Sequence, residues 1–158
     1  MAVNNARDFV VSKKQIGIVF DTAYLRTQPS GSGPDTGIYM VDNALAEGSS
    51  DEDGQELVTV CKVNDTVSWY AVPMNPTLND TVVITGWSFN NGDTYDIFNG
   101  GQGKPASVNG EDTGNYWAGK VFKSTDGTEV GYQLQILITY GADGYQHPIN
   151  WDPFIVVK

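Results

Sequence analysis

The stretch GYQLQILITY, residues 131–140, is the clearest guide to the fold of this chain. Its apolar side chains occupy every second position, at 132, 134, 136, 138 and 140. Gln133, Gln135 and Thr139 stand between them. Side chains alternate between the two faces of a β-strand, so this pattern is typical of a strand with one buried and one solvated face.

The segment just before this strand offers it a partner. Residues 116–122 (YWAGKVF) form a second strand-like run, and Asp126-Gly127 lies in the connection. An Asp-Gly pair between two such runs is a strong signal for a tight reversal of the chain. We therefore expect a β-hairpin that joins residues 116–122 to residues 131–140.

Further strand-like runs extend along the chain in both directions. They are rich in β-branched and aromatic residues and are separated by turn-forming residues. The expected strands are residues 15–21, 37–41, 57–63, 66–72, 81–87, 116–122, 131–140 and 153–158. The last run stays apolar from Phe154 to Val157, which predicts a strand paired inside a sheet.

Helical periodicity is absent from every segment of ten or more residues, although residues 44–47 could form one turn. Many short strands with glycine-rich connections predict an all-β fold. We expect a single-domain antiparallel β-sandwich of jelly-roll type over residues 15–158, preceded by a loose N-terminal arm at residues 1–14.

Acidic residues outnumber basic ones by 19 to 9, and the net charge is −10. Nucleic acids and anionic membranes repel such a chain, so neither is expected as a partner. Residues 1–8 lack the basic start and apolar run of a signal peptide. The expected location is the cytoplasm, with export by a route that cleaves no signal left open.

Catalytic chemistry has few candidate residues, because the chain has one cysteine and one histidine. Cys61 stands among β-branched residues and is expected to be a buried, inert thiol. His147 is expected in an exposed loop, and no Gly-x-Ser-x-Gly elbow accompanies it. We expect no catalytic residues, no enzymatic activity and no cofactor. A hydrolase using two carboxylates is the less favoured alternative.

Calcium is the one metal for which the sequence offers ligands. Asp51, Asp53 and Glu56 supply carboxylates within one loop, although their spacing is not that of an EF-hand. A solvated turn is the favoured interpretation of this loop, and a calcium site is the alternative.

Two tryptophans stand beside amides and carboxylates, a combination found in saccharide sites. The candidate ligand-binding residues are Trp87, Asn90, Asn91 and Asp93 in one segment and Asn150, Trp151 and Asp152 in another. For either ring taken singly, we favour the alternative that it fills the core of the sandwich.

Four stretches of the chain resemble the AidA/PixA family of bacterial inclusion-body proteins. They are residues 37–42, 56–69, 83–88 and 151–158, and the closing DPFIVVK is the most specific. Members of that family usually carry phenylalanine where Trp87 and Trp151 stand. One branch is rich in methionine, whereas this chain has three methionines.

The resemblance implies a small bacterial β-sandwich. Some members of the family form crystalline inclusions in the cytoplasm, and the family has no agreed activity from which catalytic residues could be carried over. The function expected is therefore a non-enzymatic protein that self-associates as a homo-oligomer, most simply a dimer, with a saccharide as its candidate small ligand. A purely structural or storage protein is the alternative.

Overall fold

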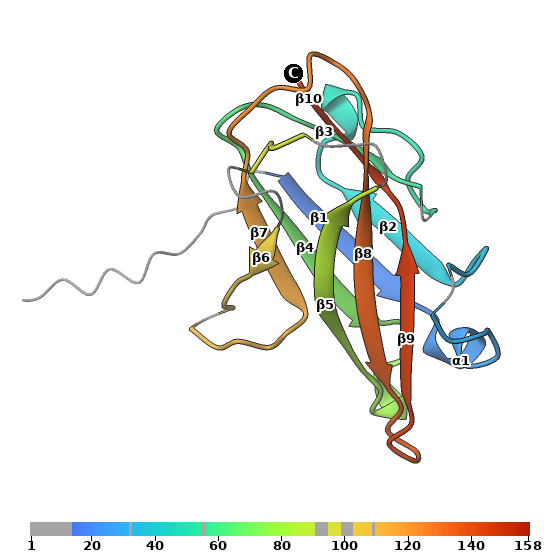
Figure 1. Ribbon diagram of the computed structural model, residues 1–158. Helices are drawn as coiled ribbons and strands as arrows, with labels where there is room; N and C mark the ends of the chain where they lie inside the picture. Colours follow the sequence, from blue (N-terminus) through green and yellow to red (C-terminus); the bar gives the residue numbers. More distant parts are fainter. Residues whose placement is uncertain (1–13, 32, 55, 91–94, 99–102, 109) are drawn as a thin grey trace, which may run out of the picture.

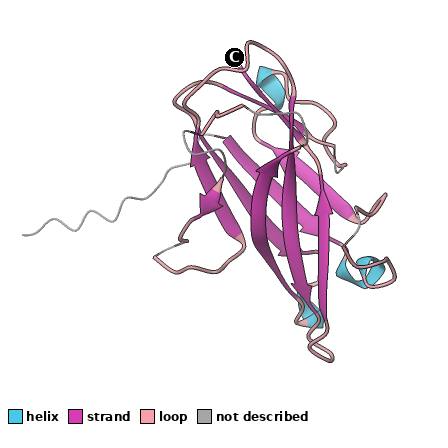
Figure 2. Ribbon diagram, in the orientation of Figure 1, coloured by secondary structure: helices cyan, strands magenta, loops and turns pink. Residues whose placement is uncertain are grey.

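The computed structural model describes residues 14–31, 33–54, 56–90, 95–98, 103–108 and 110–158. The strands are β1 (Lys14–Phe20), β2 (Ile38–Asp42), β3 (Val58–Cys61), β4 (Thr66–Pro73), β5 (Thr81–Phe89), β6 (Lys104–Pro105), β7 (Tyr116–Lys120), β8 (Val130–Thr139), β9 (Gln146–Trp151) and β10 (Phe154–Val157). The helical segments are α1 (Thr22–Leu25), η1 (Leu45–Glu47) and η2 (Pro76–Leu78). All three are single turns at the periphery of the strands, and η1 is the turn expected at residues 44–47 (Figure 2).

The strands form two layers that face each other (Figure 1). The first sheet has the order β2-β1-β4-β7-β6. In the second sheet β8 pairs with β5 along one side and with β9 and then β10 along the other, and β10 also pairs with β3. The all-β sandwich expected from the sequence is confirmed. Two pairs, β1 with β4 and β3 with β10, are parallel, so both sheets are mixed.

Aromatic rings fill the centre of the space between the sheets. The indole N–H of Trp69 donates a hydrogen bond to the hydroxyl of Tyr132 at 3.0 Å. Tyr132 stacks on Trp87, with 4.9 Å between ring centroids and 11° between planes. All three side chains are buried, so their packing carries a large share of the hydrophobic stabilisation.

The expected hairpin between residues 116–122 and 131–140 is wrong, because β7 and β8 belong to different sheets. Asp126 and Gly127 do adopt the positive φ angles of a tight turn, 53° and 79°. The turn nevertheless carries the chain from one sheet to the other, and it is held by Thr125 N–H donating to the carbonyl of Val157 at 3.1 Å. Local turn chemistry reversed the chain, but long-range packing selected the strand partners.

β9 is a strand that we did not expect from the sequence, because Pro148 and several polar residues interrupt its apolar pattern. The carbonyl of Pro148 accepts from Gly31 N–H at 2.7 Å, on the side away from β8. A proline on that side removes no hydrogen bond from the ladder. His147 belongs to this strand and is 1% exposed, so the expectation of an exposed loop histidine was wrong.

The terminal strand is paired within the sheet, as expected. Ile155 and Val157 are fully buried in the main core. Phe154 is only partly buried and packs against a second, small cluster formed by Val58, Val60 and Val156. The N-terminal arm expected at residues 1–14 lies outside the described residues, except that Lys14 begins β1.

Candidate functional site

The two tryptophans of the expected saccharide site lie inside the sandwich. Trp87 is 2% exposed and Trp151 is 3% exposed. Trp151 packs edge-on against Phe20 at 5.5 Å, and its indole N–H contacts the sulfur of Met40 at 3.1 Å. Both rings therefore act as core residues and offer no face on which a sugar could stack at the surface.

The polar residues of the same candidate site do meet in part. The side-chain amide of Asn90 donates to the carboxylate of Asp152 at 3.2 Å, in an exposed position. Asn150 lies nearby in the chain on β9 and is half-buried. Asn91 and Asp93 lie outside the described residues. The structure thus joins the two segments through one polar contact.

The acidic loop expected as a metal site covers the open edge of β2. Met40 N–H donates to the carbonyl of Gly54, and Asp53 N–H donates back to the carbonyl of Met40. Asp51 and Asp53 are exposed and have positive φ angles of 59° and 66°. Glu56 is exposed as well. Among the described residues, no group of three or more His, Cys, Asp or Glu side chains is placed to hold a metal ion.

The thiol and the imidazole of the chain are both buried. Burial raises the pKa of the Cys61 thiol to about 12, which keeps it protonated and unreactive at neutral pH. The Nδ1 atom of His147 lies 3.2 Å from the hydroxyl of Tyr140, and the two can share a hydrogen bond. Neither group is positioned to meet a substrate from solution.

A different surface has the properties of an interaction site: the side of the first sheet that faces away from the core. Two rows of side chains run across its strands in register. The name "outer face" is used below for these seven residues: Gly17, Val19, Tyr39, Val41, Tyr70, Val72 and Tyr116. Every one of them is uncharged, although the chain carries a net charge of −10.

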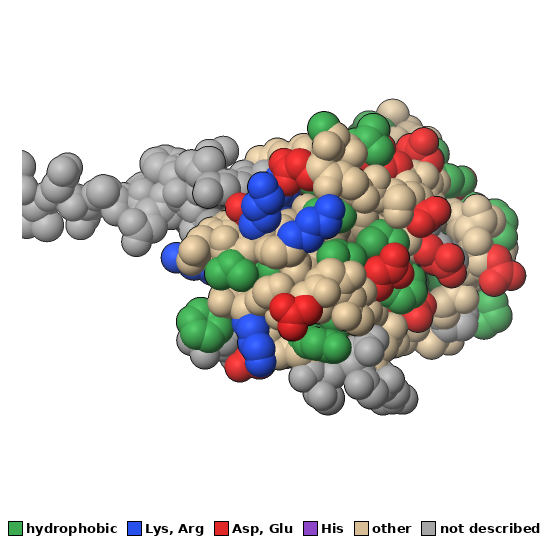
Figure 3. Space-filling model, turned by 90° about the horizontal axis from the view of Figure 1, so that it is seen from above, with side chains coloured by type: hydrophobic (Ala, Val, Ile, Leu, Met, Phe, Trp, Pro, Cys, Tyr) green, Lys and Arg blue, Asp and Glu red, His purple; other side chains and the backbone are tan. Residues whose placement is uncertain are grey.

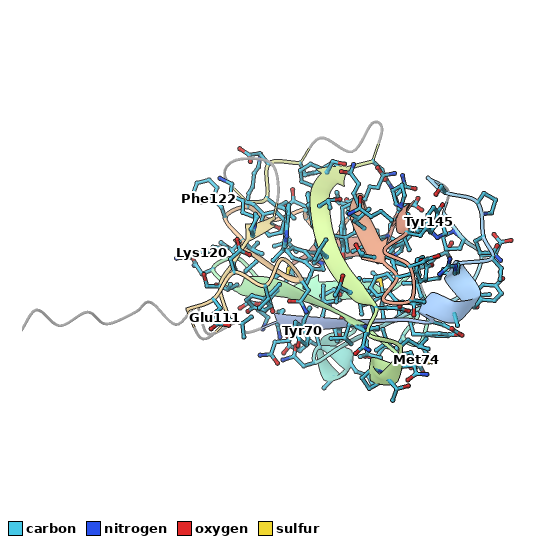
Figure 4. The ribbon with its side chains drawn as sticks, turned by 90° about the horizontal axis from the view of Figure 1, so that it is seen from below. Tyr70, Met74, Glu111, Lys120, Phe122 and Tyr145 are labelled. Atoms are coloured by element: carbon cyan, nitrogen blue, oxygen red, sulfur yellow. The ribbon has the colours of Figure 1, made fainter. Side chains whose placement is uncertain are left out.

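Large apolar side chains of the outer face reach solvent. Tyr70 is 46% exposed and Val41 is 42% exposed. The rings of Tyr70 and Tyr116 meet edge to face, with centroids 6.4 Å apart. Seen from below, Tyr70 lies with Met74 along the side of the molecule that β1 and β4 form (Figure 4). A contiguous apolar surface of this kind marks a site of interaction more often than chance exposure does.

The end of the sandwich near the C-terminus differs from the outer face. Seen from above, it mixes acidic and basic side chains with small apolar areas (Figure 3). An ion pair between Lys14 and Glu47 belongs to this end, and the Lys158 ammonium lies 3.4 Å from the carbonyl of Glu47. This end has the composition of an ordinary solvated surface.

The edges of both sheets are closed at several points by the chain itself. Loop or flanking residues bind the edge strands β2, β3, β5 and β9 through backbone hydrogen bonds, namely Met40 N–H to Gly54 O, Ser50 N–H to Val58 O, Ile84 N–H to Gly114 O and Gly31 N–H to Pro148 O. Lys104 and Pro105 make up β6, and proline has no N–H to donate. Addition of a strand from another molecule is therefore obstructed, whereas Tyr70 and Val41 of the outer face are exposed in the part of the chain that the structure describes.

The sequence carried a signal for this face that we did not use. In β1, β2 and β4, valines and tyrosines stand at several outward positions, in addition to the apolar residues at the inward ones. Only the register of three strands showed that these outward residues lie side by side.

Comparison with known proteins agrees with the fold. The family model described as "Domain of unknown function (DUF8788)" matches residues 13–144. A crystal structure of the inclusion body protein PixA from Burkholderia cenocepacia J2315 superimposes with a TM-score of 0.72 at 16% sequence identity. The match covers 92% of this chain and 94% of that chain. The resemblance to PixA expected from the sequence is thus confirmed in the fold.

No curated protein matches this chain in sequence. Within the part of the chain that the structure describes, no helix is long and apolar enough to cross a membrane.

Proposed function

This chain belongs to the family described as a domain of unknown function, DUF8788, and we propose that it is a non-enzymatic β-sandwich that associates with copies of itself. The observation that carries the proposal is the outer face, an uncharged apolar surface on a strongly acidic protein. The fold that the chain shares with an inclusion body protein supports the same conclusion.

Charge explains why association would use this surface. Two copies, each with a net charge of −10, repel each other wherever their acidic surfaces approach. The outer face brings no charge into the contact, and burial of its tyrosines and valines removes apolar area from water. Association through it therefore avoids contact between charged surfaces.

The positions of Cys61 and His147 support the non-enzymatic part of the proposal. Nucleophilic and general-base catalysis need a group that can reach the substrate. The thiol is buried and protonated, and the imidazole is buried beside Tyr140.

The bacterial cytoplasm, as expected for an inclusion-type protein, is the compartment that we propose.

Sedimentation velocity of the full chain over a wide concentration range tests the proposal. We expect a dimer or a larger species that dissociates on dilution. A single monomeric species at the highest concentration that stays soluble would contradict self-association.

Two further assays separate the alternatives. Binding on a glycan array would add saccharide recognition to self-association, and the exposed Asn90 and Asp152 would then be the first residues to change. Turnover of chromogenic glycosides that is lost on changing a pair of carboxylates would instead support a hydrolase.

A further inference from the structure

Gly17 lies in the middle of the outer face, inside strand β1, where a glycine lowers the stability of the strand. Glycine inside a strand weakens it and often marks a place where another molecule or backbone approaches closely. The φ angle of Gly17 is not positive, so its backbone conformation is open to other residues. A Cβ atom at this position would meet, among the described residues, only the Cγ2 atom of Val41, at an ordinary contact distance of 3.6 Å. Nothing within the described chain requires a glycine here.

Two other strand glycines have visible reasons. A Cβ atom at Gly86 would lie 1.9 Å from the Oε1 atom of Gln135, because the glutamine side chain lies over that glycine. A Cβ atom at Gly119 would lie 2.7 Å from the ring of Phe98. In both cases the chain fills the space that the missing side chain leaves. At Gly17 a Cβ atom would fit without a clash among the described residues, with only an ordinary contact to Val41.

The open space has a neighbour of matching shape. Tyr70 is the register partner of Gly17 on the adjacent parallel strand β4, so hollow and ring stand at the same height on the sheet. Tyr70 is 46% exposed and lies on the side of the molecule that β1 and β4 form (Figure 4). One surface thus carries a knob and a hole side by side, as a self-complementary interface requires.

We propose that two copies pack outer face against outer face about a two-fold axis parallel to the strands and midway between β1 and β4. This inference rests on the self-association proposed above and specifies its geometry. The rotation exchanges the two sides of the face, so β1 of one copy lies over β4 of the other. Tyr70 of each copy then fills the hollow above Gly17 of the partner subunit. Sheets packed with their strands nearly aligned are a common arrangement in β-proteins.

The positions of Gly17 and Tyr70 select this axis. An axis across the strands would lay each strand over its own copy, so Tyr70 on β4 could not reach Gly17 on β1 of the partner subunit. The border at β6 and β7 carries both signs of charge, because exposed Lys104 and Lys120 stand there together with exposed Glu111 and Asp112. Its two lysines would face the acidic loop beyond β2 of the other copy.

Other occupants of the face fit the observations less well. A saccharide needs several hydrogen-bonding groups, and the seven residues offer only the tyrosine hydroxyls as polar side-chain groups. A second copy supplies the ring for the hollow, and its own hollow receives the ring in return.

Two variants that should each lose association alone, and regain it when mixed, test the geometry. Gly17→Tyr fills the hollow, so its homodimer would force the introduced ring against Tyr70 twice. Tyr70→Gly removes the knob, so its homodimer would bury two empty hollows. In a mixed dimer each remaining tyrosine faces a glycine. We expect each variant alone to associate at least about tenfold more weakly than the wild-type chain, and a 1:1 mixture to regain association.

Controls keep the outcomes distinct. Gly17→Ala adds one methyl group without a clash, so the variant should fold normally but associate more weakly. Thr81→Tyr changes an exposed strand position on the second sheet and should alter neither folding nor association. Circular dichroism and thermal melting check folding. Wild-type dimers with variants that associate normally, or with mixtures that stay impaired, would overturn this geometry alone. A wild-type monomer would overturn the proposed function as well.

Discussion

The two outward sides of this sandwich differ in how far their large apolar side chains reach solvent. On the first sheet Tyr70 and Val41 are exposed, in a row with Gly17, although polar residues such as Gln15 also face outward. On the second sheet the outward positions are mainly polar, among them Gln133, Gln135 and Thr139 on β8, Thr81 on β5 and Gln146 on β9. The outward Val83 and Leu137 of that sheet are only partly exposed. Both sheets bury their inward side chains in the same core, so this difference in exposed apolar side chains does not come from the core.

The glycines sharpen this comparison. Gly86 on the second sheet is covered by the side chain of Gln135, so that surface is complete within one chain. Gly17 on the first sheet has no described side chain lying over it at clashing distance, and a Cβ atom there would make only an ordinary contact of 3.6 Å with Val41. A surface finished by its own side chains suits contact with water, whereas a surface with an open hollow and a projecting ring suits contact with another molecule.

The largest expected effect concerns the aromatic side of the comparison. Tyr70→Ala should weaken self-association by at least about tenfold, because an exposed aromatic at the centre of an interface contributes a large share of its free energy. Gln135→Ala is the matched change on the second sheet and should leave the sedimentation profile unchanged. If the two variants weaken association equally, the two faces do not differ in role.

A glycine on the inward side should be far less tolerant than one on either outer side. Gly119→Ala places a methyl group against the buried ring of Phe98, 2.7 Å from its nearest atom. We expect a loss of about 1–3 kcal/mol in the free energy of unfolding, measured by urea denaturation. An unchanged midpoint of urea denaturation would mean that Phe98 and its neighbours can shift to accommodate the methyl group without loss of stability.

Gly86→Ala should cost less than about 1 kcal/mol, because the exposed side chain of Gln135 can swing away from the new methyl group. The loss should disappear in a Gln135→Ala background, since the obstacle is then gone. Gly17→Ala, by contrast, should keep or raise the melting temperature by itself. A loss of stability at position 17 comparable to that at position 86 would remove the distinction between the two glycines.

The smallest expected effect lies at the borders of the outer face. Lys104→Ala together with Lys120→Ala should weaken association about two- to fivefold at low salt, since exposed ion pairs contribute little each. The double variant should also be less sensitive to added salt than the wild-type chain, because screening acts on the charges that it lacks. A salt dependence equal to that of the wild-type chain would show that Lys104 and Lys120 do not face the acidic loop.

Most strand positions were predictable from the sequence, although β6 and β9 were missed, and strand partners were not. The alternation in residues 131–140 predicted β8 with its buried and solvated faces, and the apolar run after Pro153 predicted β10. Both signals are local, because side chains alternate along any strand. The hairpin assigned to Asp126 and Gly127 failed because the turn fixes only a reversal of direction, while the choice of sheet depends on contacts far apart in the sequence.

The candidate site shows the same division. The sequence correctly indicated that aromatic residues matter, but burial separates Trp87 and Trp151, which fill the core, from Tyr70, which reaches solvent. His147 was expected in a loop and lies in the core, because Pro148 bonds on the side away from β8 and so lets the strand continue through it. Residue type alone cannot tell a core ring from a surface ring.

By itself, the sequence determined most of the strand positions and the resemblance in fold, because these follow from short-range patterns, and it determined the acidic charge through its composition. Only the tertiary structure placed Gly17 beside Tyr70, which lies far from it along the chain, with Val41 and Tyr116 in the same row. The register between strands decides which side chains become neighbours, and that register is set by packing of the whole core. The outer face therefore exists only in the folded sheet.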